Sequence, residues 1–128
     1  MDIGIGTYTS KGFDETVSAV RAGLDARGLR VASEFDVSAV LREGGSVDDR
    51  RVMSLAVYTP EFVAGAYDVS KDVALMVPVN VVVRESAEGC LVEALNPDLL
   101  TTQVAGGLQP LVEELRGRLR ELTQELSD

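Results

Sequence analysis

The spacing of hydrophobic residues along the chain predicts helices that alternate with strands. Residues 13–27 show the four-three-four spacing of a helix with one apolar face, and Gly28 is well placed to end it. The residues on that face are Phe13, Val17, Val20 and Leu24. Residues 2–9 alternate weakly, and residues 29–37 alternate clearly, between apolar and polar side chains. Both stretches are therefore predicted to be strands.

The middle of the chain predicts two short helices with a strand between them. Asp36 or Ser38 can cap a helix that stops at the glycine pair 44–45. Residues 51–59 are rich in valine and leucine and are predicted to be a strand. Residues 60–70 begin with a proline at a favoured first helical position, which predicts a short helix.

The most hydrophobic stretch, residues 73–83, is predicted to be a strand although it contains Pro78 and Asn80. Proline cannot donate a hydrogen bond to a neighbouring strand, so we expect a bulged or bent strand here. Two interpretations of Asn80 stay open: it satisfies backbone groups that the bulge leaves unpaired, or the bulge turns it into a pocket. Residues 90–95 are predicted to complete a hairpin after a connection of five or six residues.

The end of the chain carries the clearest helical period, over residues 108–126. Its apolar stripe consists of Leu108, Leu111, Val112, Leu115, Leu119, Leu122 and Leu126. This helix either packs across its own sheet or supplies a coiled-coil seam, and the two are compatible if the domain dimerises. Residues 96–107 are predicted to be a loop. The order β-α-β-α-β-α-β-β-α predicts a single α+β domain over residues 1–128, with a mixed or antiparallel sheet and helices mainly on one face.

Composition and charge exclude several classes of function. The chain has 128 residues, 21 acidic and 12 basic, for a net charge of −9, which disfavours binding to nucleic acid or anionic lipid. No apolar run approaches the length of a membrane span, and the first residues do not resemble a signal peptide. The single Cys90 fits a reducing compartment, so we expect a cytoplasmic protein. Because histidine is absent, His-based triads and most zinc sites are excluded, and we expect no metal or cofactor.

Several stretches together resemble one family of small α+β domains. They are residues 13–41, YTPEF at 58–62, LMVPVNVVV at 75–83 and VEALNP at 92–97. In this combination, which covers about residues 5 to 125, the chain resembles the DUF302 domain, a bacterial and archaeal family of unassigned function. The resemblance implies an α+β fold and a homodimer.

The chain departs from the pattern of that family at two positions. Where family members usually have Asn-Pro, this chain has Thr59-Pro60, and where they have Pro-Cys-Asn, it has Val79 between Pro78 and Asn80. If relatives use that cysteine for thiol or metal chemistry, this protein cannot do so in the same way. Cys90, at the start of the next predicted strand, is interpreted as a small strand residue and not as a nucleophile.

The polar side chains near the predicted strand ends define a candidate site. Glu34 and Asp36 lie on the same side of their strand by period two and are candidates for acid-base chemistry, although Asp36 is also a natural helix cap. The candidate ligand-binding residues are Asn80, Tyr58, Thr59 and Pro78. Our first hypothesis is a non-catalytic cytoplasmic dimer that binds a small molecule or a protein partner. The alternative is an enzyme of small-molecule or natural-product metabolism, in which the two carboxylates catalyse and Asn80 and Tyr58 orient the substrate.

Overall fold

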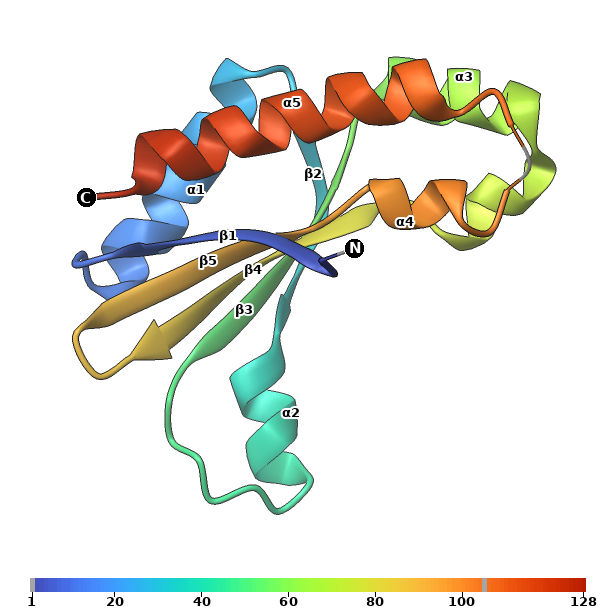
Figure 1. The fold of residues 1–128 in the computed structure, drawn as a ribbon. Coiled ribbons are helices and arrows are strands. Elements are labelled where there is room, and N and C mark those ends of the chain that lie inside the picture. The colour runs from blue at the N-terminus through green and yellow to red at the C-terminus, as the bar shows by residue number, and fades with distance from the viewer. Residues whose placement is uncertain (1, 105) are drawn as a thin grey trace.

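The computed structural model describes residues 2–104 and 106–128 and contains a five-stranded sheet with helices packed on one face (Figure 1). The strands are β1 (Gly4–Thr9), β2 (Arg30–Asp36), β3 (Val52–Tyr58), β4 (Val79–Ser86) and β5 (Gly89–Leu95). The helices are α1 (Phe13–Ala26), α2 (Val37–Glu43), α3 (Pro60–Val69), α4 (Asp98–Thr101) and α5 (Gln109–Leu126), with a 3₁₀ turn η1 (Lys71–Leu75). The predicted α+β fold and element order are confirmed, with η1 and α4 as additions.

The sheet is antiparallel throughout, in the spatial order β1-β5-β4-β3-β2. Helices α1 and α5 contact each other and pack on the same face of the sheet (Figure 1). Helix α3 contacts the N-terminal part of α5. Helix α2 stands out from the body beyond the end of β2. No helix in the described ranges is long and apolar enough to cross a bilayer.

The hydrophobic core fills the space between α1, α5 and the sheet, because alternate residues of the central strands point toward these helices. The buried strand residues include Leu55, Val57, Val79, Val81, Val83, Cys90, Val92 and Ala94. Opposite them lie Val17, Val20 and Leu24 of α1 and Val112, Leu115, Leu119 and Leu122 of α5. The opposite side of each strand is left outside this core.

The apolar stripe of α5 is buried within its own domain. Val112, Leu115, Leu119, Leu122 and Leu126 are each at most 4% exposed. A Cβ added at Gly23 of α1 would lie 2.5 Å from Cδ1 of Leu122, so the two helices touch through a glycine. The helix-on-sheet interpretation therefore describes α5, and its stripe is not free to form a coiled-coil seam.

The prediction of one bulged strand over residues 73–83 is wrong. Residues 71–75 form the 3₁₀ turn η1, which Ser70 caps by accepting a hydrogen bond from the backbone N–H of Asp72. Pro78 follows a cis peptide bond with Val77 and lies immediately before β4, where its missing N–H removes nothing from the ladder. The register shift that marks a bulge lies instead in β2, between Val31 and Ser33.

Two connections also differ from prediction. The β4–β5 hairpin turns through Ala87 and Glu88 alone, because both strands extend further than predicted. Gly89 makes the tight return possible: its φ is +152°, and a Cβ there would lie 2.0 Å from the carbonyl oxygen of Thr9. Residues 96–107, predicted to be a loop, contain α4.

Candidate functional site

The side of the sheet turned away from α1 and α5, here called the open face, presents a band of apolar and small side chains. Strand register aligns these residues in rows across the sheet. One row runs over all five strands as Gly6, Glu93, Val82, Ser54 and Phe35. Phe35 is 54% exposed, so the row ends in a large apolar side chain at the β2 edge.

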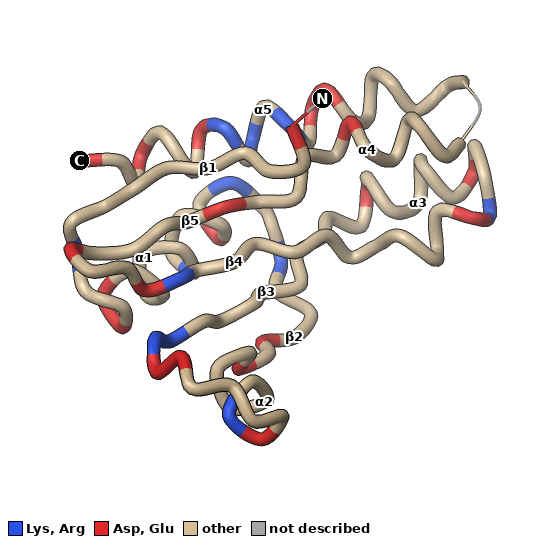
Figure 2. The backbone as a smooth tube through the Cα atoms, turned by 60° about the horizontal axis from the view of Figure 1, so that its bottom comes forward, with Lys and Arg blue, Asp and Glu red and all other residues tan. Residues whose placement is uncertain are grey.

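The neighbouring rows of the open face have the same character. One contains Tyr8, Leu91, Arg84 and Val52, and the other contains Gly4, Leu95, Asn80, Ala56 and Ser33. Most acidic residues of this −9 protein lie on helices, turns and chain ends, as Figure 2 shows. Among the strand residues of the open face, Glu93 is acidic and Arg84 is basic, with Arg30 at the end of β2. The open face is therefore close to neutral on a strongly acidic molecule.

A shallow depression of about 190 Å³ lies on the open face where β1, β5 and β4 run side by side. Ile3, Val82 and Leu95 give it apolar walls. Asn80 and Glu93 are its polar side chains. The depression thus combines an amide and a carboxylate with an apolar surround, the composition of many small-molecule sites.

The carboxylate of Glu93 lies over the backbone of β1 because Gly4 has no side chain. A Cβ at Gly4 would be 2.4 Å from Oε2 of Glu93 and 2.6 Å from its Cδ. On the other side, Nη2 of Arg84 is 4.0 Å from Oε1 of Glu93, at the outer limit of an ion pair. Gly4 therefore makes room for a carboxylate that lies along the depression.

Of the predicted ligand-binding residues, the structure places Asn80 and Tyr58 on the open face. Asn80 pairs with Ala56, and Tyr58 lies two residues further along the same side of β3. Pro78 is exposed immediately before β4, next to this end of the sheet. Asn80 lines the depression, whereas Tyr58 and Pro78 lie outside it.

Thr59 has a structural role as the N-cap of α3 and does not lie on the open face. It is 4% exposed, and its Oγ1 accepts a hydrogen bond of 3.0 Å from the backbone N–H of Phe62, which caps α3. It lines a small cavity of about 40 Å³ between α3 and α5, with Leu111 and Arg118. The structure therefore separates Thr59 from Asn80.

The two candidate carboxylates have structural partners. Arg21 of α1 donates hydrogen bonds of 2.8 and 2.6 Å to Glu34, and this contact lowers the pKa of the Glu34 carboxyl. Asp36 is the N-cap of α2 and accepts a hydrogen bond of 3.2 Å from the backbone N–H of Ala39. The Ser38 hydroxyl and the Ala39 N–H hold the pKa of Asp36 below its ordinary value. The prediction that Asp36 caps the helix is confirmed.

The structure does not bring these carboxylates together with Asn80. Glu34 and Asp36 pair with Leu55 and Met53, on the helix-covered side of the sheet. Asp36 is three residues along the strand and two strands across from Asn80. Strand geometry then puts their Cα atoms about 14 Å apart, since each of those offsets covers about 10 Å.

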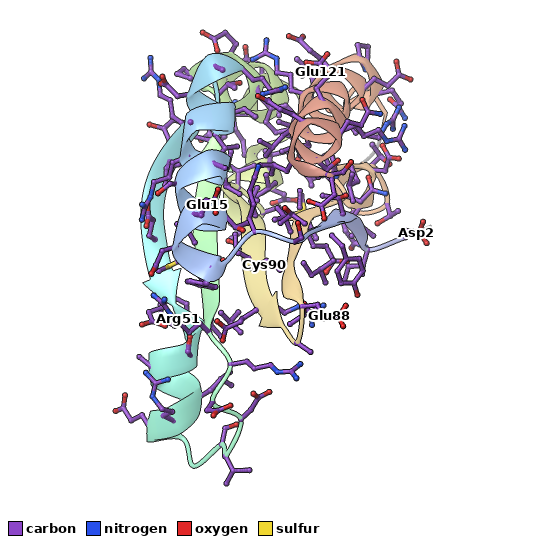
Figure 3. All side chains as sticks on the ribbon, turned by 90° about the vertical axis from the view of Figure 1, so that its left-hand side faces the viewer. Asp2, Glu15, Arg51, Glu88, Cys90 and Glu121 are labelled. Carbon is purple, nitrogen blue, oxygen red and sulfur yellow. The ribbon has the colours of Figure 1, made fainter. Side chains whose placement is uncertain are left out.

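Neither a reactive thiol nor a metal centre is found within the described part of the chain. Cys90 lies inside the core between the sheet and α1 (Figure 3), and burial raises the pKa of its thiol. No cluster of three or more His, Cys, Asp or Glu side chains among residues 2–104 and 106–128 could hold a metal ion.

Sequence reasoning did not single out Glu93, Gly4 or Ile3. Glu93 lies between Val92 and Ala94, so it looks like an ordinary polar residue on the outer side of a strand. The available signal was the pair Gly4 and Gly6 on one side of an edge strand, since glycine in a strand often marks a close approach by another group.

Comparison with known proteins supports the fold and leaves the activity open. Residues 5–126 match the model of a family described as "Domain of unknown function DUF302". The crystal structure of an uncharacterized conserved DUF302 protein from Bacillus stearothermophilus superposes with a TM-score of 0.90. It is 20% identical in sequence, and the match covers 98% of this chain and 99% of that one. No curated protein matches the sequence.

Proposed function

The chain belongs to the DUF302 family, a domain of unknown function, and from its geometry we propose a non-catalytic homodimer that binds a small molecule at its open face. The observation that carries this proposal is the contrast between the open face and the rest of the surface. A molecule of net charge −9 has one broad sheet face that is apolar and nearly neutral. Such a face is suited to burial against another surface.

The partner that best fits this face is a second copy of the same chain. Two copies repel each other through most of their acidic surfaces, and the open face is where this repulsion is weakest. A two-fold interface places the same patch on both sides, so its charges must complement themselves. Arg84 and Glu93 meet this condition, because the strands of the open face carry one charge of each sign, so the face does not repel its own copy.

The sheet alone is smaller than a standard protein–protein interface, so the proposed dimer also needs contacts from α2 and the loop that follows it. Five strands of about six residues cover about 24 by 20 Å, or roughly 480 Å² as a flat projection. A standard interface buries about 800 Å² per partner. The surface relief of side chains adds area, and α2 with the loop after it carries exposed apolar residues beyond the end of β2 (Figure 1). These are Val40, Leu41 and Val47, which are 46%, 39% and 99% exposed.

A second copy would also complete the small-molecule site. The depression of about 190 Å³ is below the usual range of about 300–1,000 Å³ for ligand pockets and is open on one side. A sheet face laid over it supplies the missing wall. We therefore expect the ligand to bind between two copies, against Asn80 and Glu93.

Two further observations favour binding over catalysis. A general base needs a pKa near the working pH and access to a substrate. Glu34 and Asp36 both have lowered pKa values, and each already makes a structural contact.

The lone cysteine, buried as a free thiol, fits the cytoplasm as the place where this protein acts.

The proposal is tested by the mass of the protein in solution before and after Phe35→Asp. Sedimentation equilibrium of the unmodified chain should give twice the 13.7 kDa of one copy. Phe35→Asp puts a charge into the proposed interface, and because a buried unpaired charge is costly, the variant should be a monomer.

Leu75→Asp is the matched control, since Leu75 is 86% exposed on η1, outside the open face, and the substitution changes the net charge equally. Circular dichroism melting of both variants verifies that they are folded. A monomer for the unmodified chain at about 100 μM would overturn the proposed dimer, as would equal dissociation in the two variants.

A further inference from the structure

The depression on the open face carries an inference about the chemistry of its ligand. We propose that it binds a small organic cation, a primary amine or guanidine on a short apolar body. This inference rests on the small-molecule site proposed above and adds the class of ligand. Four features support it: the carboxylate of Glu93, the amide of Asn80, the missing side chain at Gly4 and the apolar walls.

Glu93 supplies the charge and still has capacity to accept hydrogen bonds. Its carboxylate has no hydrogen-bond donor among residues 2–104 and 106–128, and the contact with Arg84 is 4.0 Å long. A carboxylate can accept about four hydrogen bonds. An ammonium or guanidinium group presents several N–H donors and a matching charge, so it is the natural complement of this oxygen pair.

Gly4 determines where that charge lies. Because β1 is an edge strand and Gly4 lacks a Cβ, the Glu93 side chain can extend from its partner Gly6 toward Gly4 along the strand. Any larger residue at position 4 would collide with the carboxylate, whose Oε2 would be 2.4 Å from the new Cβ. The glycine therefore keeps the carboxylate at the depression.

Asn80 and the walls select the rest of the ligand. The Asn80 side chain makes no hydrogen bond to any other described residue, so both its oxygen and its NH₂ group are available. Ile3, which is 72% exposed, and the side chains of Val82 and Leu95 offer an apolar contact. The volume of about 190 Å³ suits a body smaller than a typical drug.

Anions are disfavoured at this place for two reasons. Glu93 lies in the depression itself, and the whole molecule has a net charge of −9 that attracts cations and repels anions over long range. Arg84 lies one row away on β4, opposite Leu91, and it does not line the depression. The charge of Glu93 and the net charge of the molecule therefore both favour a cationic ligand.

The test compares three probes that share a phenethyl body and differ in charge. Phenethylamine, phenethyl alcohol and hydrocinnamate are titrated separately into the full-length protein, and binding is followed by NMR chemical shifts. We expect the amine to bind at least about ten-fold more tightly than the alcohol, with hydrocinnamate weakest. Glu93→Gln should remove this preference, and Gly4→Ala should reduce it because the carboxylate is displaced.

Glu88→Gln is the matched control, because Glu88 is exposed at the tip of the β4–β5 hairpin and away from the depression (Figure 3). It should keep the preference for the amine. Equal binding of amine and alcohol, or an equal effect of the two glutamate substitutions, would overturn the inference.

The mass of each sample is measured in parallel, so that the two proposals fail separately. If the protein is a dimer that binds alcohol and amine equally, the proposed cationic ligand is refuted and the proposed dimer is not. If the protein is a monomer that binds the amine through Glu93, the proposed dimer is refuted and the proposed cationic ligand is not.

Discussion

The contact between α1 and α5 allows a sharp test with one substitution made at two glycines. Gly23 of α1 and Gly117 of α5 both lie inside helices, where alanine is favoured over glycine by about 0.8–1 kcal/mol. A Cβ at Gly117 would meet nothing within 4 Å, whereas at Gly23 it would lie 2.5 Å from Cδ1 of Leu122. The two sites differ in packing and not in backbone preference.

The expected free energies of unfolding follow from that difference. Gly117→Ala should stabilise the protein by about 0.8 kcal/mol, since only the helix preference acts. At Gly23 the clash is with a leucine that is 0% exposed and surrounded by core. Overpacking of this kind costs about 1–3 kcal/mol, which exceeds the gain, so Gly23→Ala should destabilise by about 1 kcal/mol.

A double-mutant cycle isolates the contact. Leu122→Ala alone should cost about 2–5 kcal/mol because it leaves a cavity. In that background the clash is gone, so Gly23→Ala should stabilise by up to about 1 kcal/mol, giving a coupling of about 2 kcal/mol. Urea unfolding followed by circular dichroism measures all four proteins. Stabilisation by Gly23→Ala in the unmodified background would show that α5 does not pack on α1 as described.

Two other predictions concern the hairpin and the β2 edge. Gly89→Ala should cost about 2 kcal/mol or more in urea unfolding, because its φ of +152° is strained for alanine and the Cβ would meet Thr9. Gly12→Ala should cost less, about 0.5–1 kcal/mol, because its Cβ would have nothing within 4 Å and only the weaker N-cap preference of alanine acts. Because Arg21 lowers the pKa of Glu34, the stability from this contact is present above the ordinary carboxyl pKa and is lost as the pH falls through the lowered value. Glu34→Gln should therefore cost about 0.5 kcal/mol at pH 7, given the partial exposure of the pair. The difference from the unmodified protein should shrink as the pH falls through the lowered pKa of Glu34, and a constant difference would contradict the contact.

The helices were predictable to within one or two residues where their apolar side chains kept a clear period. Helix α1 was predicted over 13–27 and observed over 13–26, and α5 over 108–126 and observed over 109–126. Each has one buried stripe, so the pattern contains the answer. Residues 73–83 have no such pattern, because a run that is apolar at nearly every position fits a strand and a buried turn equally. In the structure the strand begins directly after Pro78.

The candidate site was partly predictable for the same reason. Period two places Asn80 on one side of β4, but which side faces solvent depends on the helices, and those contacts are not local in sequence. The importance of Glu93 depends on Gly4 of β1, 89 residues earlier and brought beside it only by strand pairing. No local rule connects an edge glycine to a glutamate so distant in the chain.

The bulge in β2 explains why Glu34 and Asp36 are absent from the open face. Arg30 pairs with Tyr58 and lies on the open side, and in a regular strand Glu34 and Asp36 would follow it there by period two. The extra residue between Val31 and Ser33 reverses the alternation, so both carboxylates turn toward the helices.

The consequences of that single residue reach the proposed function. Glu34 meets Arg21, Asp36 caps α2, and Phe35 takes the outward position in the row of Val82. With the opposite alternation, the open face would carry the carboxylates of Glu34 and Asp36 in addition to that of Glu93, and it would lose Phe35, its large exposed apolar residue in β2. It would then repel a second acidic copy. The bulge therefore keeps the face neutral enough to pair with itself, with Glu93 as the charge available to a cationic ligand.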